Sequence, residues 1–182
     1  MVYRWSIISE LIVHHGYKDI CEIGISVGDN VRNIRRCLKD RKYHLDNFIG
    51  IDPHIDERYK LVPENIKFSE FKYLNMDSNE ALGFFKDDSL DLIFIDGSHD
   101  PKQIEKDIVN YTKKMKDGSC IIGDDYNDFT GKGIKEVVQR LIGVKNLHTV
   151  KDKRLESGRE NWLWWTYVKR GENNGQEYTH KI

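Results

Sequence analysis

The sequence predicts an α/β protein: a Rossmann-like, doubly wound sheet of seven strands, mostly parallel, with an antiparallel hairpin at one edge. Short apolar segments typical of buried strands alternate with amphipathic segments of helical period along most of the chain. The last two apolar segments follow one another without a helical pattern between them, which predicts the antiparallel pair. With 182 residues, 38% of them hydrophobic, the chain is long enough for one domain with its own core.

Composition limits the domain organisation and the class of partner. We expect one domain over residues 1–170 and a disordered tail over residues 171–182, which are polar and contain Gly and Asn. The 29 basic and 30 acidic residues nearly balance, so charge gives no reason to expect a nucleic-acid partner. No apolar run approaches the roughly 20 residues that cross a bilayer, and no secretory signal is visible at the start. We therefore expect a cytoplasmic protein without a membrane partner.

Apolar spacing and turn residues predict each element in order. We expect a first strand that begins at Asp19 and six further strands over residues 48–52, 66–69, 91–95, 118–123, 146–150 and 162–168. The helices are expected at residues 3–15, from the turn after Gly28 to about Leu38, after an N-cap at Asp77, over residues 101–115, and around Ile134 to Leu141. The cysteines are odd in number, form no CxxC pair and lie in or beside apolar runs, so we expect reduced core residues at Cys21, Cys37 and Cys120.

Acidic residues stand at or beside the ends of four predicted strands. They are Glu22 on the first strand, Asp52 on the second, Asp96 on the fourth, and Asp124 with Asp125 on the fifth. The carboxyl ends of parallel strands meet at one edge, where open α/β sheets bind their ligands. Each acid alone could cap a helix or form a turn. Their repetition indicates a site instead, because crowded carboxylates raise the electrostatic free energy unless a cation or a donor-rich ligand offsets it.

The turn after the first strand discriminates between nucleotide cofactors. It contains Gly24, Ser26 and Gly28 and lacks the G-x-G-x-x-G spacing that seats a pyrophosphate on a helix N-terminus. An acid at Glu22 suits a cationic ammonium better than a pyrophosphate. S-adenosylmethionine offers an ammonium, a ribose and an adenine but no phosphate, and Asp52 could accept hydrogen bonds from both ribose hydroxyls.

The strand-end motifs together resemble class I S-adenosylmethionine-dependent methyltransferases, and more narrowly the small-molecule O-methyltransferases grouped with macrocin O-methyltransferase and the cephalosporin-hydroxylase-type proteins. The motifs are Glu22-Ile-Gly24-Ile-Ser-Val-Gly28, Ile51-Asp52, Ile95-Asp96-Gly97-Ser98-His99 and Gly118-Ser-Cys-Ile-Ile-Gly123-Asp124-Asp125-Tyr126. They fall within roughly residues 18–142. The Gly-containing turn is weakly specific. Asp-Gly-Ser-His after one strand combined with Gly-Asp-Asp-Tyr after the next is much more specific.

The resemblance implies S-adenosylmethionine as cofactor and assigns residues to its parts. The first turn would line the methionine part, Asp52 would hold the ribose hydroxyls, and the segment at Asp77 would lie near the adenine. The residues implied to bind the cofactor are Glu22, Gly24, Ser26, Gly28, Asp52, Asp77, Ser78 and Asp96.

The resemblance also implies a divalent cation. Asp96, Asp124 and Asp125 match the positions at which metal-dependent members bind it, and three hard oxygen ligands suit Mg²⁺. Such an ion would lower the pKa of a bound substrate hydroxyl and hold that hydroxyl in line with the methyl group. Some related enzymes carry Asp-Asn here, so which of the two adjacent acids binds the metal stays open.

His99 is the candidate general base, with Asp96 as the second catalytic candidate, because a histidine side chain can accept a proton near neutrality. The plain alternative is that His99 caps the next helix. The acceptor would be a small-molecule hydroxyl, possibly on a sugar. The aromatic residues of the last strand alternate, so one set would fill the core and the other would form an acceptor wall or an interface, as in a homodimer.

Two other functions compete with this hypothesis. The chain could be a non-catalytic S-adenosylmethionine-binding module of the same fold, since fold does not guarantee activity. Such a module would be expected to have lost cofactor and metal positions, whereas Glu22, Gly24, Asp52 and Asp96 are all present. It could also be an NAD(P)-dependent oxidoreductase, which the first turn disfavours. A nucleic-acid methyltransferase is disfavoured by the balanced charge and by the lack of an Asn-Pro-Pro-Tyr-type motif after the fourth strand.

Overall fold

The computed structural model describes residues 2–53, 66, 68–127, 133–152, 161–170 and 176–179. Its strands are β1 (Asp19–Ile23), β2 (Asn47–Ile51), β3 (Phe71–Leu74), β4 (Leu90–Ile95), β5 (Met115–Gly123), β6 (His148–Asp152), β7 (Asn161–Arg170) and β8 (Gln176–Thr179). They form one sheet in the order β3-β2-β1-β4-β5-β7-β6, and β8 also pairs with β7.

The sheet is mixed in the predicted way. β1 runs parallel to β2 and β4, and the β2–β3 and β4–β5 pairs are parallel as well. β7 runs antiparallel to β5, β6 and β8. The mostly parallel sheet with an antiparallel edge hairpin is therefore confirmed.

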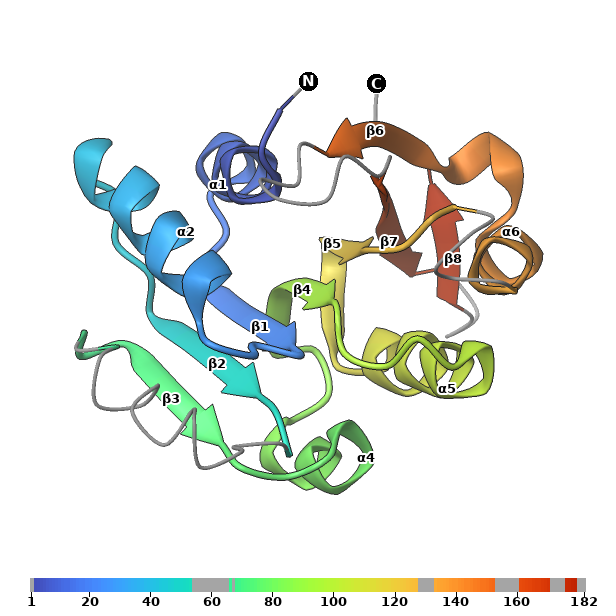
Figure 1. The fold of residues 1–182 in the computed structure, drawn as a ribbon, viewed down its shortest axis with the longest axis horizontal. Helices are drawn as coiled ribbons and strands as arrows, with labels where there is room; N and C mark the ends of the chain where they lie inside the picture. Colours follow the sequence, from blue (N-terminus) through green and yellow to red (C-terminus); the bar gives the residue numbers. More distant parts are fainter. Residues whose placement is uncertain are drawn as a thin grey trace.

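Helices cover both faces of this sheet. They are α1 (Arg4–His15), α2 (Asp29–Asp40), α4 (Ser78–Ala81), α5 (Pro101–Thr112) and α6 (Ile134–Ile142), with 3₁₀ turns η2 (Leu82–Phe84) and η3 (Val144–Asn146). Figure 1 shows α1 and α2 on one face and α4, α5 and α6 on the other. None of the helices in the described ranges is long and apolar enough to cross a membrane.

The central strand β4 shows how the two layers are made. Leu92 and Phe94 pack into the apolar cluster with α1 and α2, whereas Ile93 and Ile95 pack into the cluster with α5 and α6. All four side chains are buried because a parallel strand with helices on both faces is apolar throughout. The polar residues that follow β4 are thus held at the edge of a rigid core.

The structure corrects several element predictions, among them those of the third strand and of the helix after β4. The third strand is Phe71–Leu74 and not residues 66–69, because Phe68, Ser69 and Glu70 precede the strand and a turn bond runs from Phe71 N to Phe68 O at 3.1 Å. The helix predicted over residues 101–115 ends at Thr112, since Met115 already begins β5.

The tail differs from the sequence expectation as well. Residues 176–179 form β8, which pairs antiparallel with β7, where we expected disorder. β8 pairs with residues 167–170 of β7, mostly beyond the part of β7 that pairs with β5. Backbone pairing to such a strand edge can order a polar segment that has no apolar pattern of its own. The rest of the expected tail, residues 171–175 and 180–182, lies outside the described residues.

Gly24 fixes the spacing between the carboxyl ends of β1 and β4. Its φ is +86°, and a Cβ placed there would lie 2.2 Å from the backbone oxygen of Asp96. Only glycine allows this close approach together with this backbone conformation. The turn after β1 therefore packs directly on the turn after β4.

We predict that Gly24→Ala destabilises the fold by about 2 kcal/mol or more, because a left-handed conformation and overpacking both oppose the added methyl. Chemical denaturation measures the change in the free energy of unfolding. Gly83→Ala is the matched control, since a Cβ at Gly83 meets nothing within 4 Å. Equal stabilities of the two variants would contradict the close approach at Gly24.

Candidate functional site

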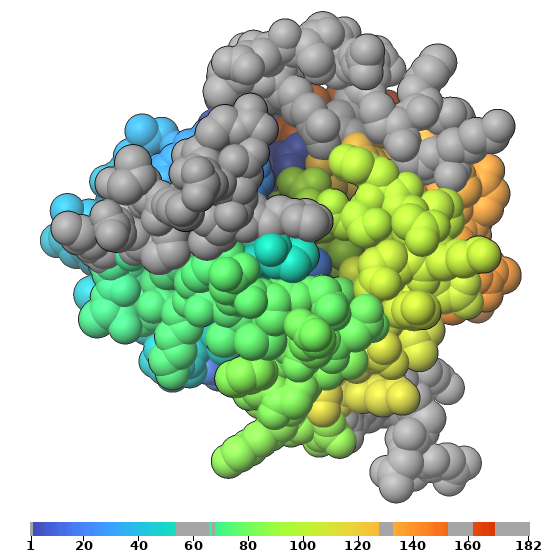
Figure 2. Space-filling view, turned by 60° about the horizontal axis from the view of Figure 1, so that its bottom comes forward, coloured from blue at the N-terminus to red at the C-terminus, as the bar shows by residue number. Residues whose placement is uncertain are grey.

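A cleft of about 1200 Å³ lies at the carboxyl ends of β1, β2 and β4. The space-filling view shows this edge, where teal atoms after β2 and dark blue atoms of the N-terminal segment lie close to the yellow-green β4–α5 segment (Figure 2). The cleft brings together most of the residues predicted from the sequence. Those that line it are Gly24, Ser26, Asp52, Asp77, Ser78, Asp96 and His99.

Four of the predicted residues do not line this cleft. Glu22 is buried beneath the first turn and accepts a hydrogen bond from Asn30 Nδ2 at 3.1 Å. Gly28 is the N-cap of α2, with φ of 77°. Asp124 and Asp125 are buried at the end of β5.

The turn after β1 and the end of β2 are locked to each other. The backbone N–H of Ser26 donates to Asp52 Oδ2 at 2.8 Å, and Ser26 has a φ of 46°, which is unusual for a residue with a Cβ. The hydroxyl of Tyr73 donates to the backbone oxygen of Asp52 at 2.6 Å. Asp52 is therefore held at the cleft wall beside the turn.

The opposite wall combines helix caps with a buried polar cluster. Asp77 caps α4 by accepting from the N–H groups of Asn79 and Glu80, as predicted. Ser78 Oγ donates to Asp107 Oδ1 at 2.6 Å, and Gln103 Nε2 donates to the same oxygen at 2.9 Å. Burial raises the pKa of Asp107, although these hydrogen bonds act to lower it.

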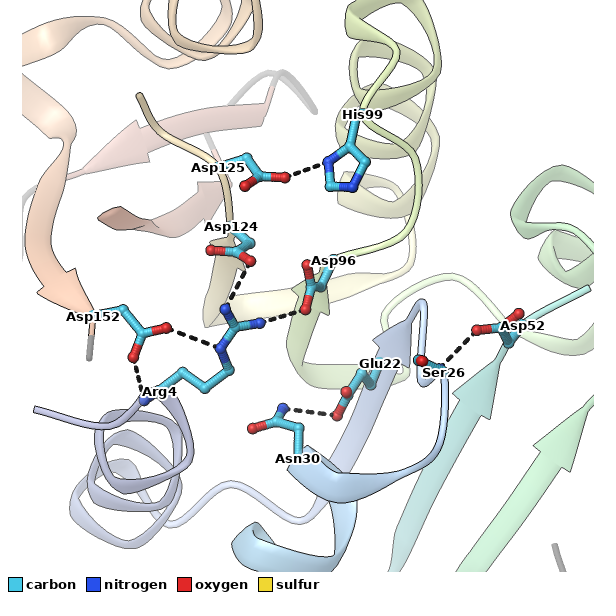
Figure 3. Close-up of polar contacts among 10 residues, drawn as sticks. All are labelled: Arg4, Glu22, Ser26, Asn30, Asp52, Asp96, His99, Asp124, Asp125 and Asp152. Atoms are coloured by element: carbon cyan, nitrogen blue, oxygen red, sulfur yellow. Dashed lines mark hydrogen bonds and ion pairs between the residues drawn. The ribbon is translucent and has the colours of Figure 1, made fainter. Parts of the chain in front are cut away.

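Arg4, the first residue of α1, reaches into the acidic edge. As Figure 3 shows, its guanidinium lies between Asp96 and Asp124, and its Nε points toward Asp152. Nη1 forms an ion pair with Asp96, Nη2 donates to Asp124 at 2.9 Å, and Nε donates to Asp152 at 3.0 Å. Burial alone would lower the pKa of Arg4, but the three carboxylates more than offset it and raise that pKa above its usual value.

His99 pairs with Asp125 on the other side of the cluster. Its Nδ1 contacts the Asp125 carboxylate (Figure 3), and its side chain is 61% exposed, whereas that of Asp125 is 5% exposed. Asp125 has a φ of 56°, a strained conformation of the kind that gathers at functional sites. The N-cap of α5 is Asp100, which accepts from Lys102 N at 3.1 Å, so His99 does not have the capping role considered as its alternative.

The predicted metal ligands are close together but already hold a cation. Asp96, Asp124 and Asp125 can each offer an oxygen, and these atoms lie within 4.8 Å of one another. Two of the three, Asp96 and Asp124, are bound by the Arg4 guanidinium. In this arrangement the group does not fit a divalent ion, because the guanidinium stands among the oxygens that such an ion would need.

Sequence reasoning missed Arg4, Asp152 and the polar pair Gln103 and Asp107. Arg4 did leave one signal, because a cation in the first turn of a helix is opposed by the helix dipole. The first turn of α1 contains no acid, and its N-cap Tyr3 makes no side-chain cap. Asp152 supplies the missing acceptor, since its Oδ1 takes the backbone N–H of Arg4 at 3.0 Å.

A family model described as a methyltransferase domain matches residues 21–126, which include the first turn and the ends of β4 and β5. Among curated proteins, none matches this sequence.

The fold is found in solved structures of several transferases. N-methyltransferase NodS from Bradyrhizobium japonicum WM9 superposes with a TM-score of 0.66 at 16% identity, over 90% of this chain and 93% of NodS. The O-methyltransferase from Bacillus cereus, in complex with SAH, superposes with a TM-score of 0.65 at 17% identity, over 91% of this chain and 80% of that enzyme. Spermidine synthase from Thermotoga maritima superposes with a TM-score of 0.64 at 12% identity, over 86% of this chain and 56% of the synthase. At these identities the likeness concerns the fold.

We predict a pH-dependent stability that depends on Glu22. Burial raises the pKa of Glu22 from 4.5 to about 8, although the hydrogen bond from Asn30 and the charge of Arg4 lower it. Between these values the folded state binds more protons than the unfolded state, so the contribution of Glu22 to stability is full below pH 4.5 and is lost as the pH rises to 8. Glutamine carries no charge at any pH. As the pH rises through that range, the free energy of unfolding of Glu22→Gln should therefore increase relative to that of the wild type, by roughly 2–5 kcal/mol.

Urea unfolding of both proteins at several pH values between 5 and 8 tests this prediction. Glu136→Gln, at an exposed position of α6, is the matched control. A difference between Glu22→Gln and the wild type that stays constant with pH would contradict it.

Proposed function

Since this chain belongs to the methyltransferase domain family, we propose that it transfers the methyl group of S-adenosylmethionine to a hydroxyl of a small molecule, with a sugar as one candidate acceptor. The observation that carries the cofactor proposal is the charge of the cleft. Its charged lining residues, within the described part of the chain, are Arg4 and five acids: Asp29, Asp52, Asp77, Asp96 and Asp107.

This charge balance discriminates between the two nucleotide cofactors. The pyrophosphate of a nicotinamide dinucleotide is anionic and would be repelled by the acidic walls. S-adenosylmethionine has a cationic ammonium and a sulfonium and no phosphate. Asp29 stands in the first turn of α2, the place where a dinucleotide fold would seat its pyrophosphate, so the oxidoreductase alternative is disfavoured.

The residues of the cleft walls divide between the parts of this cofactor. Asp52, which is held by a hydrogen bond from the backbone N–H of Ser26, would accept hydrogen bonds from the ribose hydroxyls. The wall with Asp77 and Ser78 would lie beside the adenine, and Gly24 lets the first turn approach the methionine part closely. When bound, the cofactor supplies a methyl group on a positively charged sulfur. Support for it also comes from the fold, which NodS and the Bacillus cereus enzyme share in their SAH complexes.

His99 and Asp125 would remove the proton of the acceptor. A carboxylate beside Nδ1 favours the tautomer with the proton on Nδ1, so that Nε2 can accept a proton. The exposed ring lines the cleft next to Asp96, where an acceptor can reach it. Because a hydroxyl is a weak nucleophile until it loses its proton, this pair supports an oxygen acceptor.

The proposed methyl transfer does not use a divalent cation. One oxygen of Asp96 and one of Asp124, two of the three acids that would hold it, are bound to Arg4. Asp96 remains a candidate catalytic residue, because it lines the cleft between the first turn and His99.

We predict that Asp52→Asn weakens S-adenosylmethionine binding at least tenfold, because it removes the charge that would receive the ribose hydroxyls. Calorimetric titration of S-adenosylmethionine, and of NADH in parallel, measures the affinities. Asp40→Asn, at the exposed end of α2, is the control that should bind like the wild type. Tight NADH binding without S-adenosylmethionine binding would favour the oxidoreductase instead.

We predict that His99→Ala lowers kcat by roughly 10²–10⁴-fold with an unchanged Kd for S-adenosylmethionine, since general-base catalysis is typically of that size. The readout is formation of S-adenosylhomocysteine with a panel of small hydroxyl acceptors. His44→Ala, another exposed histidine, is the matched control. Turnover of His99→Ala at the wild-type rate would exclude this base, and S-adenosylmethionine binding without turnover on any acceptor would favour the non-catalytic module.

A further inference from the structure

The acidic cluster at the ends of β4 and β5 has the composition of a divalent-cation site. Asp96, Asp124 and Asp125 bring carboxylate oxygens within 4.8 Å of one another, and hard oxygens at this spacing suit Mg²⁺ or Mn²⁺. Carboxylates gathered in this way repel one another unless a positive charge lies among them. The described structure contains such a charge in the chain itself.

That charge is the Arg4 guanidinium. It forms ion pairs with Asp96 and with Asp124, the latter at 2.9 Å, and only 12% of its side chain is exposed. An arginine side chain keeps its proton in proteins, so Arg4 cannot leave the cluster by becoming neutral. A divalent ion could use the two oxygens that Arg4 binds only if the side chain moved away.

Asp152 holds Arg4 in this position. One carboxylate oxygen accepts the backbone N–H of Arg4 and the other accepts Nε, each at 3.0 Å. Asp152 is itself buried at the end of β6, and Val2 forms a bridge with it. Both the start of α1 and the direction of the guanidinium are thus fixed by one residue from the far edge of the sheet.

We propose that Arg4 is the built-in cation of this cluster, taking the place of a divalent metal ion between Asp96 and Asp124 and keeping the affinity for such ions low. Two effects act together. The guanidinium repels a cation a few ångströms away, and it occupies the oxygens by charge-assisted hydrogen bonds. Asp152 is the positioning residue that keeps it there.

A titration with Mn²⁺ alone tests the proposal, with electron paramagnetic resonance of the free ion as the readout. Arg4→Gln removes the charge and should bind one Mn²⁺ at least tenfold more tightly than the wild type. Arg4→Lys keeps the charge and should bind as weakly as the wild type. Adding Asp124→Asn to Arg4→Gln should abolish the gain, which would place the ion at this cluster.

Two further variants control for general charge and for folding. Arg140→Gln removes an exposed arginine paired with Glu105 and should leave Mn²⁺ affinity unchanged. Arg4→Gln leaves buried Asp152 without its arginine and could fold poorly, which circular dichroism would reveal. The double variant Arg4→Gln with Asp152→Asn removes both charges, leaves the three cluster acids in place, and should show the same gain.

The proposal is overturned if neither folded Arg4→Gln variant binds Mn²⁺ more tightly than the wild type. It is also overturned if the wild type binds one Mn²⁺ as tightly as these variants do and loses it in Asp124→Asn. No cofactor or acceptor is present in this titration, so its outcome is independent of whether the protein transfers a methyl group.

Discussion

The ion-pair network of Arg4 is the interaction on which the site depends. One guanidinium joins the start of α1 to the ends of β4, β5 and β6, through Asp96, Asp124 and Asp152 (Figure 3). Taking these charges out of water is costly, and removing one partner of a buried ion pair typically costs about 3–5 kcal/mol. The network therefore couples the N-terminal helix to the antiparallel edge of the sheet and sets the charge at the centre of the acidic edge.

The remaining acids at this edge are accommodated in different ways. Asp125 lies against His99, and Asp52 accepts the backbone N–H of Ser26. Burial raises the pKa of Glu22 to about 8, so this group is mainly protonated at neutral pH. The parallel sheet brings these acids together. Each of them is then stabilised by a proton, by a neighbouring cation or by a hydrogen-bond donor. The cleft between them stays acidic, which suits a cationic cofactor.

Local patterns predicted the sheet and its helices, and most of the site residues expected from the sequence line the cleft. Asp77 could be predicted as a cap because its partners are the next residues of the chain, Asn79 and Glu80. Gly24 could be predicted as a turn residue, but its close approach to the backbone of Asp96 could not. The ion pair of Arg4 with Asp152 joins residues 148 positions apart, and no local pattern encodes such a contact. The division of roles between Asp124 and Asp125 was equally hidden, because it depends on the positive φ at Asp125 where β5 has just ended.

The most direct test of this account is a crystal structure of the protein grown with S-adenosylhomocysteine and Mn²⁺. The account predicts the nucleoside in the cleft, with its ribose hydroxyls on Asp52, and the Arg4 guanidinium still between Asp96 and Asp124 without a metal ion. An empty cleft would contradict the proposed cofactor. A Mn²⁺ ion bound by the three aspartates, with Arg4 displaced, would contradict the role given to Arg4.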